Sequence, residues 1–209
     1  MAKHLFLEGP IQIGKSTLLR HLLAPYASQI AGFSSQRLTD IGGDTIAFRI
    51  VDAQDFRLTM PYEEAIKSNE SMPETLQNSG VFRVIPKGGK SENYHDVFEN
   101  IGLKLLDNFS NKRLILLDEI GGIELKSEPF RNALYDILSG DIPCIGVIKS
   151  HKKATHLTDG RPKTNAMSDL NLQLRDYVLN SCDGEILSFN REDSSIKSAV
   201  EKFISDAFL

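Results

Sequence analysis

The strongest constraint on the fold of this chain is an eight-residue stretch, 9–16, that matches the pattern G-x-x-x-x-G-K-[ST] at each defined position. It follows residues 4–8, a short apolar segment without glycine or proline that is typical of a buried strand. It precedes residues 17–23, where leucines keep the spacing of an amphipathic helix. A glycine-rich loop between a strand and a helix predicts a phosphate-binding P-loop and an α/β fold.

The residue types in this loop suit an anion site. Gly9 and Gly14 permit backbone angles and close approach that a Cβ would block, and N–H groups at the positive end of the next helix can then face a phosphate. We expect Lys15 to contact the β- and γ-phosphates of a nucleoside triphosphate and the Ser16 hydroxyl to bind Mg²⁺. The predicted nucleotide-binding residues are Gly9, Pro10, Ile11, Gln12, Ile13, Gly14, Lys15, Ser16 and Thr17.

Composition narrows the class of protein further. A length of 209 residues suits a single P-loop NTPase domain over 1–209, and 24 basic against 28 acidic residues give a net charge of −4 that offers no reason to expect nucleic-acid binding. Cys144 and Cys182 are expected to be reduced. Because the chain has no run of about 20 apolar residues and no signal peptide pattern, we expect a cytoplasmic protein without membrane association. The oligomeric state stays open.

Apolar segments alternate with helical periodicity along most of the chain, which predicts a three-layer fold: a mostly parallel sheet with helices on both faces. Residues 32–36 and 45–51 are predicted to form a hairpin around Gly42 and Gly43, the one antiparallel feature. Residues 54–80 are predicted to be a long irregular connection, a possible substrate-side segment. The remaining predicted strands are 4–8, 81–85, 113–117, 143–148 and 185–189, and the helices are 17–23, 91–108, 128–139, 169–180 and 193–207.

A second motif lies at residues 113–119, where an apolar strand ends in Asp118 and Glu119. Ligands of doubly wound sheets bind at the carboxyl ends of the strands, so this pair and the P-loop are expected at one rim. Asp118 would help to hold Mg²⁺ together with Ser16, as a Walker-B acid does. Glu119 is placed to act as the general base that polarises an attacking water, with Lys15 as the second catalytic residue.

The stretch 118–127, Asp-Glu-Ile-Gly-Gly-Ile-Glu-Leu-Lys-Ser, resembles the signature of the THEP1-type nucleoside-triphosphatases, as do Gly32-Phe33 and the Gly-Val-Ile at 146–148. The resemblance covers most of residues 4–150. It implies a RecA-like P-loop fold and slow hydrolysis of ATP, GTP and other triphosphates with limited base selectivity, for which Ser16 and Asp118 are expected to supply the Mg²⁺ site.

The chain also departs from that family. Charged residues after Gly-Phe are replaced here by Ser34, Ser35, Gln36 and Thr39. Val147 replaces a threonine that could sense the γ-phosphate, and Lys149 or Ser150 is the candidate substitute. Glu124 matches the signature, although a salt bridge at the entry to a helix explains it as well as chemistry does.

Two other functions use the same motifs. A kinase for a nucleotide or small metabolite would need an acceptor site, for which residues 54–80 are a candidate, but no cluster of arginines typical of a lid is present. A nucleotide-dependent binding switch is the second alternative. The sequence assigns no arginine finger; the candidates are Arg20, Arg37, Arg49 and Arg83, or a residue of a second subunit.

Overall fold

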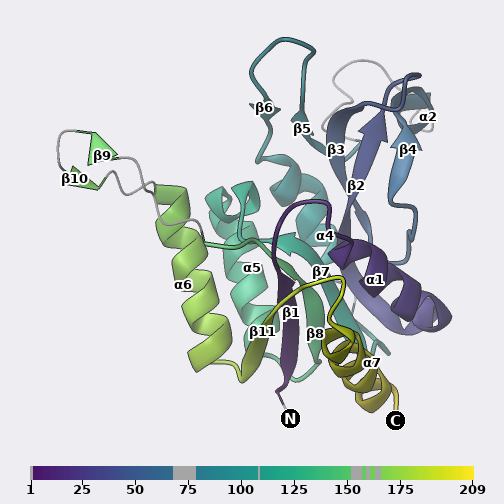
Figure 1. The fold of residues 1–209 in the computed structure, drawn as a ribbon, viewed down its shortest axis with the longest axis vertical. Helices are drawn as coiled ribbons and strands as arrows, with labels where there is room; N and C mark the ends of the chain where they lie inside the picture. The colour runs from purple at the N-terminus through teal and green to yellow at the C-terminus, as the bar shows by residue number, and fades with distance from the viewer. Residues whose placement is uncertain (1, 68–78, 108, 152–156, 159–160, 163–165) are drawn as a thin grey trace.

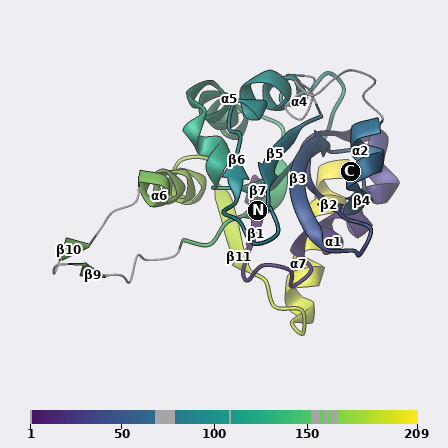
Figure 2. The ribbon, with the colours of Figure 1, turned by 90° about the horizontal axis from the view of Figure 1, so that it is seen from above.

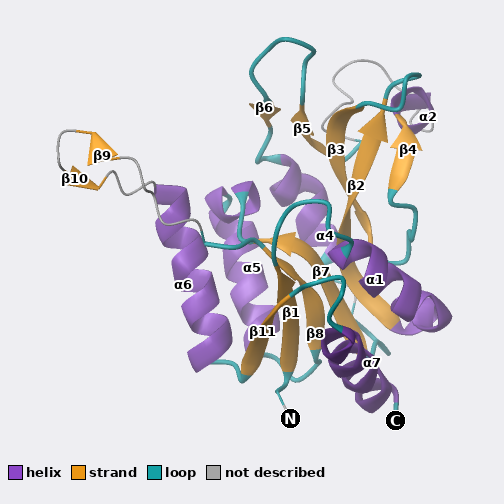
Figure 3. Cartoon of the chain, in the orientation of Figure 1, coloured by secondary structure: helices purple, strands orange, loops and turns teal. Residues whose placement is uncertain are grey.

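The computed structural model describes residues 2–67, 79–107, 109–151, 157–158, 161–162 and 166–209. Within these residues, nine strands form one sheet in the order β11-β1-β8-β7-β2-β3-β5-β6, with β4 paired to β2. Helices cover both faces (Figure 1, Figure 3). The predicted three-layer P-loop NTPase fold with a mostly parallel sheet and an added hairpin is therefore confirmed.

The parallel half of the sheet contains both motifs. Its strands are β11 (Gly184–Ser188), β1 (His4–Glu8), β8 (Cys144–Ile148) and β7 (Leu114–Ile120). β1 pairs in parallel with β8 on one side and with β11 on the other, so β8 separates the P-loop strand from the strand of Asp118. β2 (Ile30–Thr39) joins this half to the rest, because Ile30 to Phe33 pair in parallel with β7.

The antiparallel half continues from the outer end of β2. It consists of β3 (Thr45–Asp52), β5 (Val81–Val84) and β6 (Glu92–Asn93), each antiparallel to its neighbour. The hairpin of β2 and β3 is confirmed, but it is not the one antiparallel feature, since β5, β6 and the separate pair β9 (Leu157–Thr158) and β10 (Arg161–Pro162) are antiparallel too. β4 (Thr59–Pro61) lies parallel to β2.

Successive residues of the central strands are buried on opposite faces, as their continuous apolar runs require. Phe6 lies in a core beneath α5 (Glu128–Ser139) and α6 (Ala166–Asn180), whereas Leu5 and Leu7 lie in a second core beneath α1 (Lys15–Leu23) and α7 (Ser194–Phe208). Figure 2 shows these two helical layers on either side of the sheet. Shorter helices complete the fold: η1 (Ala24–Gln29), α2 (Tyr62–Lys67), η2 (Phe98–Gly102), α4 (Leu103–Leu105) and η3 (Ile123–Lys126).

Two predicted segments differ from the structure. Residues 54–80 are not irregular throughout, because β4 and α2 occupy 59–67; residues 68–78 lie outside the described part. The helix predicted over 91–108 begins only at Phe98, since 92–93 pair with β5 as β6 and turns occupy the next residues. Its first turns are a π-helix, whose wider winding the apolar spacing did not reveal.

Two buried features hold the centre of the parallel half. The His4 ring, fully buried, accepts a hydrogen bond from the Cys144 N–H at Nδ1 (3.0 Å) and lies 2.9 Å from the Leu138 carbonyl at Nε2, so it is neutral with its proton on Nε2. Gly146 of β8 faces β7 so closely that a Cβ would lie 2.0 Å from the Leu117 oxygen.

Both cysteines are free thiols, as expected. Within the described ranges, no helix combines the length and apolar character that a membrane span requires.

Candidate nucleotide site

The P-loop leaves β1 at Glu8 and ends in the first turn of α1. Its backbone is left-handed at Gly9 (φ 141°), Gln12 (φ 66°) and Gly14 (φ 101°), which explains the two glycines and leaves Gln12 in a conformation uncommon for a side-chain-bearing residue. The Lys15 ammonium donates hydrogen bonds to the carbonyls of Gly9 (3.0 Å) and Pro10 (2.6 Å). The lysine is therefore held across the loop rather than extended into solvent.

The structure brings the two motifs together. The Ser16 hydroxyl donates a hydrogen bond to Oδ1 of Asp118 at 2.8 Å, although the two residues are 102 positions apart in the sequence. The other carboxylate oxygen, Oδ2, lies 3.5 Å from the Arg20 guanidinium, and both side chains of that pair are buried. Asp118 thus links the start of α1 to the end of β7.

Burial shifts the pKa values of Asp118 and Lys15. Burial and, to a smaller extent, the Glu119 carboxylate raise the pKa of Asp118, while Arg20 and Ser16 lower it, and the net result is a pKa of about 6. Burial lowers the pKa of Lys15, against the raising effect of the Glu119 and Asp118 carboxylates. Glu119 is therefore near enough to influence both groups.

Glu119 has an unusual backbone. Its φ of 70° is left-handed, and the register between β7 and β8 shifts between Leu117 and Ile120. Such a bulge redirects a side chain that regular alternation would place on a fixed face of the sheet. A left-handed non-glycine residue costs of order 1–3 kcal/mol and often occurs at functional sites. The strand prediction, which ended at residue 117, could not reveal this bulge.

The signature residues after the acid pair lie close together. A carboxylate oxygen of Glu124, a buried residue, accepts a hydrogen bond from the Gly122 N–H at 2.7 Å. Burial raises the pKa of Glu124, and the nearby Lys149 lowers it. A Cβ on Gly122 would lie 2.2 Å from the Lys149 Nζ, so a side chain there would displace the end of the Lys149 side chain. Glu124 therefore supports the glycine turn through this hydrogen bond to Gly122.

The candidate γ-phosphate sensors occupy different places. Val147 is buried in the core beneath α1 and α7. The Ser150 hydroxyl accepts a hydrogen bond from the Gly9 N–H at 3.2 Å, whereas the Lys149 ammonium lies at Gly122, where a Cβ would be 2.2 Å from its Nζ. Of the two candidate substitutes, Ser150 is the one in contact with the P-loop.

Two of the candidate arginine fingers, Arg20 and Arg49, are buried and form hydrogen bonds within the protein. Arg20 donates hydrogen bonds to the carbonyls of Ser35 (2.7 Å) and Arg57. The Arg57 carbonyl also accepts from Gln36 at 2.8 Å, and Gln36 in turn accepts from Arg49 at 2.7 Å. These bonds form a buried chain, the Arg20–Arg49 chain, from Asp118 into the antiparallel half. Sequence reasoning placed Arg20 only among the finger candidates, because nothing in the motif spacing indicates a partner for it.

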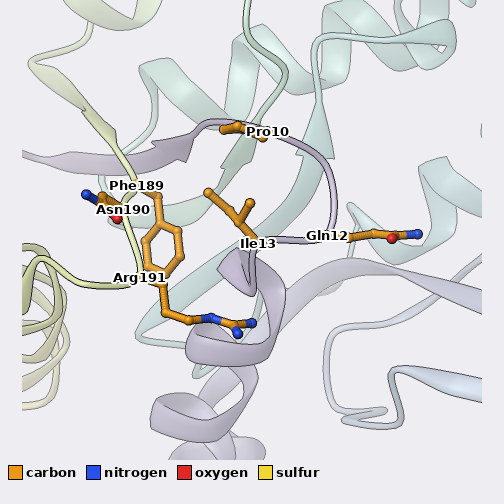
Figure 4. A pocket seen from close by; sticks show the side chains of 6 residues that line it. All are labelled: Pro10, Gln12, Ile13, Phe189, Asn190 and Arg191. Atoms are coloured by element: carbon orange, nitrogen blue, oxygen red, sulfur yellow. The ribbon is translucent and has the colours of Figure 1, made fainter.

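A second group that motif analysis missed lies on the other side of the P-loop. Phe189, Asn190 and Arg191 follow β11 and, with three P-loop residues, line a pocket of about 500 Å³. Figure 4 shows their side chains beside those of the loop. The signal that could have found them is topological: β11 is a neighbour of β1, which local patterns do not show.

The fold and these two motifs define the class of the protein as a P-loop NTPase. A family model described as NTPase matches residues 4–182, and the chain belongs to that family. The suspected THEP1-type relationship is thereby confirmed, as is the expected enzyme class, a nucleoside-triphosphate phosphohydrolase.

Individual relatives agree with this assignment. The chain is 28% identical to the nucleoside-triphosphatase THEP1 of Thermotoga sp. strain RQ2, over 90% of its own length and 97% of the relative. It is 28% identical to a cancer-related nucleoside-triphosphatase homolog of Bos taurus, over 66% of its length and 70% of the relative.

Two solved structures share the fold. The solution structure of a human cancer-related nucleoside triphosphatase matches with a TM-score of 0.59 at 21% identity, covering 98% of this chain and 97% of the other. The crystal structure of THEP1 from Aquifex aeolicus matches with a TM-score of 0.57 at 15% identity, covering 98% of each chain.

Proposed function

We propose that this protein hydrolyses the γ-phosphate of ATP, GTP and other nucleoside triphosphates, with Mg²⁺, to a nucleoside diphosphate and phosphate, slowly and with limited base selectivity. The observation that carries the proposal is the 2.8 Å contact between Ser16 Oγ and Asp118 Oδ1, with Glu119 as the next residue. This contact brings the P-loop, the two proposed Mg²⁺ ligands and the candidate base to one rim of the sheet.

In this proposal the P-loop binds the phosphates. Backbone N–H groups of residues 9–17 surround the anion at the positive end of α1. Lys15 uses two of its three N–H donors on the Gly9 and Pro10 carbonyls, and the third can reach a phosphate oxygen. A cation held across the loop also offsets the charge that develops on the γ-phosphate during transfer.

Ser16 and Asp118 fit the requirements of a Mg²⁺ site. They supply a hydroxyl and a carboxylate oxygen within hydrogen-bond distance of each other, and Mg²⁺ usually takes one or two protein oxygens beside phosphates and water. No larger cluster of candidate ligands occurs in the part of the chain described by the structure, which suits a metal held largely by its substrate. When bound, the ion would neutralise charge on the β- and γ-phosphates.

Glu119 takes the role of general base. Its carboxylate accepts the proton of a water molecule as the water oxygen attacks the γ-phosphorus and the bond to the β-phosphate oxygen breaks. The charge influence of Glu119 on both Lys15 and Asp118 supports its closeness to the phosphates. A general base of this kind contributes about 10²–10⁴-fold in rate.

The kinase alternative has less support. Its candidate acceptor segment includes Phe56, which packs against the core beneath α1 and α7, and Tyr62, which packs against a small core of the antiparallel half. Both aromatic rings thus have packing roles. Release of phosphate from a triphosphate alone, without an acceptor, separates hydrolase from kinase.

The decisive experiment measures phosphate release and nucleotide binding for a panel of triphosphates, with Mg²⁺ and with a chelator. We expect Glu119→Gln to keep binding and lose at least about 100-fold in turnover, and Lys15→Ala to lose both. Glu99→Gln and Lys202→Ala remove exposed charges of the same kinds and serve as controls. Wild-type turnover by Glu119→Gln would eliminate the general-base role, and full activity in chelator would eliminate the metal.

A further inference from the structure

The pocket beside the P-loop has the size of a small-molecule site. Its volume is about 500 Å³, within the usual range of 300–1,000 Å³. One wall is formed by the loop residues Pro10, Gln12 and Ile13, and the other by Phe189, Asn190 and Arg191 (Figure 4). A nucleotide bound to the P-loop therefore has an open space directly beside it.

The second wall is fixed to the strand that carries the P-loop. The Phe189 N–H donates to the Glu8 carbonyl at 2.8 Å, continuing the pairing of β11 with β1. Asn190 then closes the turn before α7: its side-chain oxygen accepts from the Glu192 N–H at 3.2 Å, and its carbonyl accepts from the Asp193 N–H at 3.1 Å. The pocket is thus built on anchored backbone.

The order of the strands gives a bound triphosphate a direction. Asp118 lies on β7, which is separated from β1 by β8, whereas Phe189 follows β11 on the opposite side of β1. In the proposed function the β- and γ-phosphates lie at Ser16 and Asp118. The nucleoside end of the molecule must then extend away from β7, toward the pocket.

The pocket walls match the chemistry of a nucleoside. The Phe189 ring and the Ile13 side chain offer flat and apolar surface for a base, and such stacking does not depend on which base is bound. The Arg191 guanidinium lies by the first turn of α1, 3.3 Å from where a Cβ on Gly14 would be. None of the six lining residues carries a carboxylate that would repel a phosphate.

We propose that this pocket is the nucleoside subsite, with Phe189 against the base and Arg191 at the α-phosphate. The proposal rests on the proposed function, since it takes its direction from the phosphates at Ser16 and Asp118. Arg191 donates from outside the loop to the phosphate nearest the ribose, and Phe189 contacts a part of the substrate that inorganic phosphates lack.

The test compares two probes by calorimetry with Mg²⁺: the non-hydrolysable ATP analogue AMP-PNP and inorganic tripolyphosphate. Because Phe189 also packs against the core beneath α1 and α7, Phe189→Leu is used rather than alanine. We expect Phe189→Leu to weaken AMP-PNP about 10-fold and leave tripolyphosphate unchanged, and Arg191→Gln to weaken both probes about 10-fold.

Matched controls exist away from the pocket. Phe208→Leu removes a ring that stacks on Tyr26, and Arg113→Gln removes an exposed arginine; both should bind like wild type. If Lys15→Ala abolishes AMP-PNP binding but Phe189→Leu and Arg191→Gln leave it unchanged, the proposed subsite is wrong and the proposed function still stands. Equal affinity of the wild type for the two probes would also overturn the subsite. Failure of the wild type to bind either probe would remove the proposed function itself.

Discussion

In the parallel half of the sheet, β1, β8 and nearly all of β7 are buried on both faces, whereas in the antiparallel half β3 and β5 are only partly buried and β6 is exposed. The parallel half carries the P-loop and the acid pair at its rim. The antiparallel half carries polar side chains, among them Gln36 and Arg49, that are buried by bonding to one another. The first half is held mainly by apolar packing, whereas the second combines a small apolar core with a buried polar chain.

The polar chain connects the antiparallel half to the candidate nucleotide site. The Arg20–Arg49 chain runs from Asp118 through the Ser35 and Arg57 carbonyls to Gln36 and Arg49. The family resemblance predicts charged residues after Gly-Phe, where this chain has Ser34, Ser35 and Gln36. The Arg20 guanidinium contacts both the Ser35 carbonyl and the Asp118 carboxylate, so the antiparallel half contributes to the position of Asp118.

Removing Arg20 cuts the link between the two halves of the sheet and is expected to have the largest effect. Arg20→Met leaves Asp118 buried without its cation and removes two bonds to carbonyls, so we expect a loss of about 3–5 kcal/mol in unfolding free energy by urea titration. The double variant Arg20→Met with Asp118→Asn should recover part of this, because no buried charge then remains unpaired. A strictly additive double variant would show that Arg20 does not stabilise the Asp118 carboxylate.

The stability of the protein as a function of pH reports on His4, which is buried at the centre of the parallel half. Burial lowers the pKa of His4 to about 4, below its unfolded value of 6.5, so the unfolded chain binds the proton more readily between those values. Stability should therefore be complete above pH 6.5 and fall by about 3 kcal/mol as the pH drops toward 4.

The matched variant is His4→Asn, whose amide oxygen can still accept from the Cys144 N–H but does not titrate in this range. At pH 7.5 its free energy of unfolding should be about 1 kcal/mol lower, because the hydrogen bond to the Leu138 carbonyl is lost. As the pH falls, its free energy of unfolding should decrease less than that of the wild type. The same decline in both proteins would assign the acid sensitivity to other groups.

One glycine from each half allows the packing of the two halves to be compared directly. A Cβ on Gly146 would lie 2.0 Å from the Leu117 oxygen, so Gly146→Ala should cost about 2–3 kcal/mol as β7 and β8 move apart. Gly43, at the tip of the hairpin, has a φ of 85° and no neighbour within 4 Å of such a Cβ. Gly43→Ala should cost only the backbone strain, about 1 kcal/mol. Equal losses in thermal unfolding would contradict the tighter packing of the parallel half.

The same contrast explains what the sequence predicted well. Central strands such as 143–148 are continuous apolar runs, and their helices keep a 3.6-residue period, so the parallel half and its two motifs were predictable. The segments that were mispredicted belong mainly to the antiparallel half. Residues 59–61 form a strand only because β2 offers them an edge, and 92–93 only because β5 does. Such pairing is decided by tertiary contacts that short polar segments do not encode.

For the site, the motifs predicted the P-loop and the acid pair, and the contact between Ser16 and Asp118 agrees with the expected common rim. The residues that surround these motifs could not be predicted from the sequence. Arg20 and Arg191 carry no motif, and the bulge at Glu119 arises from the register between β7 and β8. The roles of these residues remain predictions that the experiments above test.

The position of β1 in the sheet also bears on how the protein is made. Within the described residues, β1 pairs with β8 and β11, whose first residues are 144 and 184. At roughly 5–20 residues per second, a ribosome that has made β1 needs about 7–27 s more to begin β8. Throughout that time the apolar residues 5–7 have no partner strand to join. A nascent chain that has just passed residue 119 holds both motifs in its sequence, yet the sheet that brings them together does not exist.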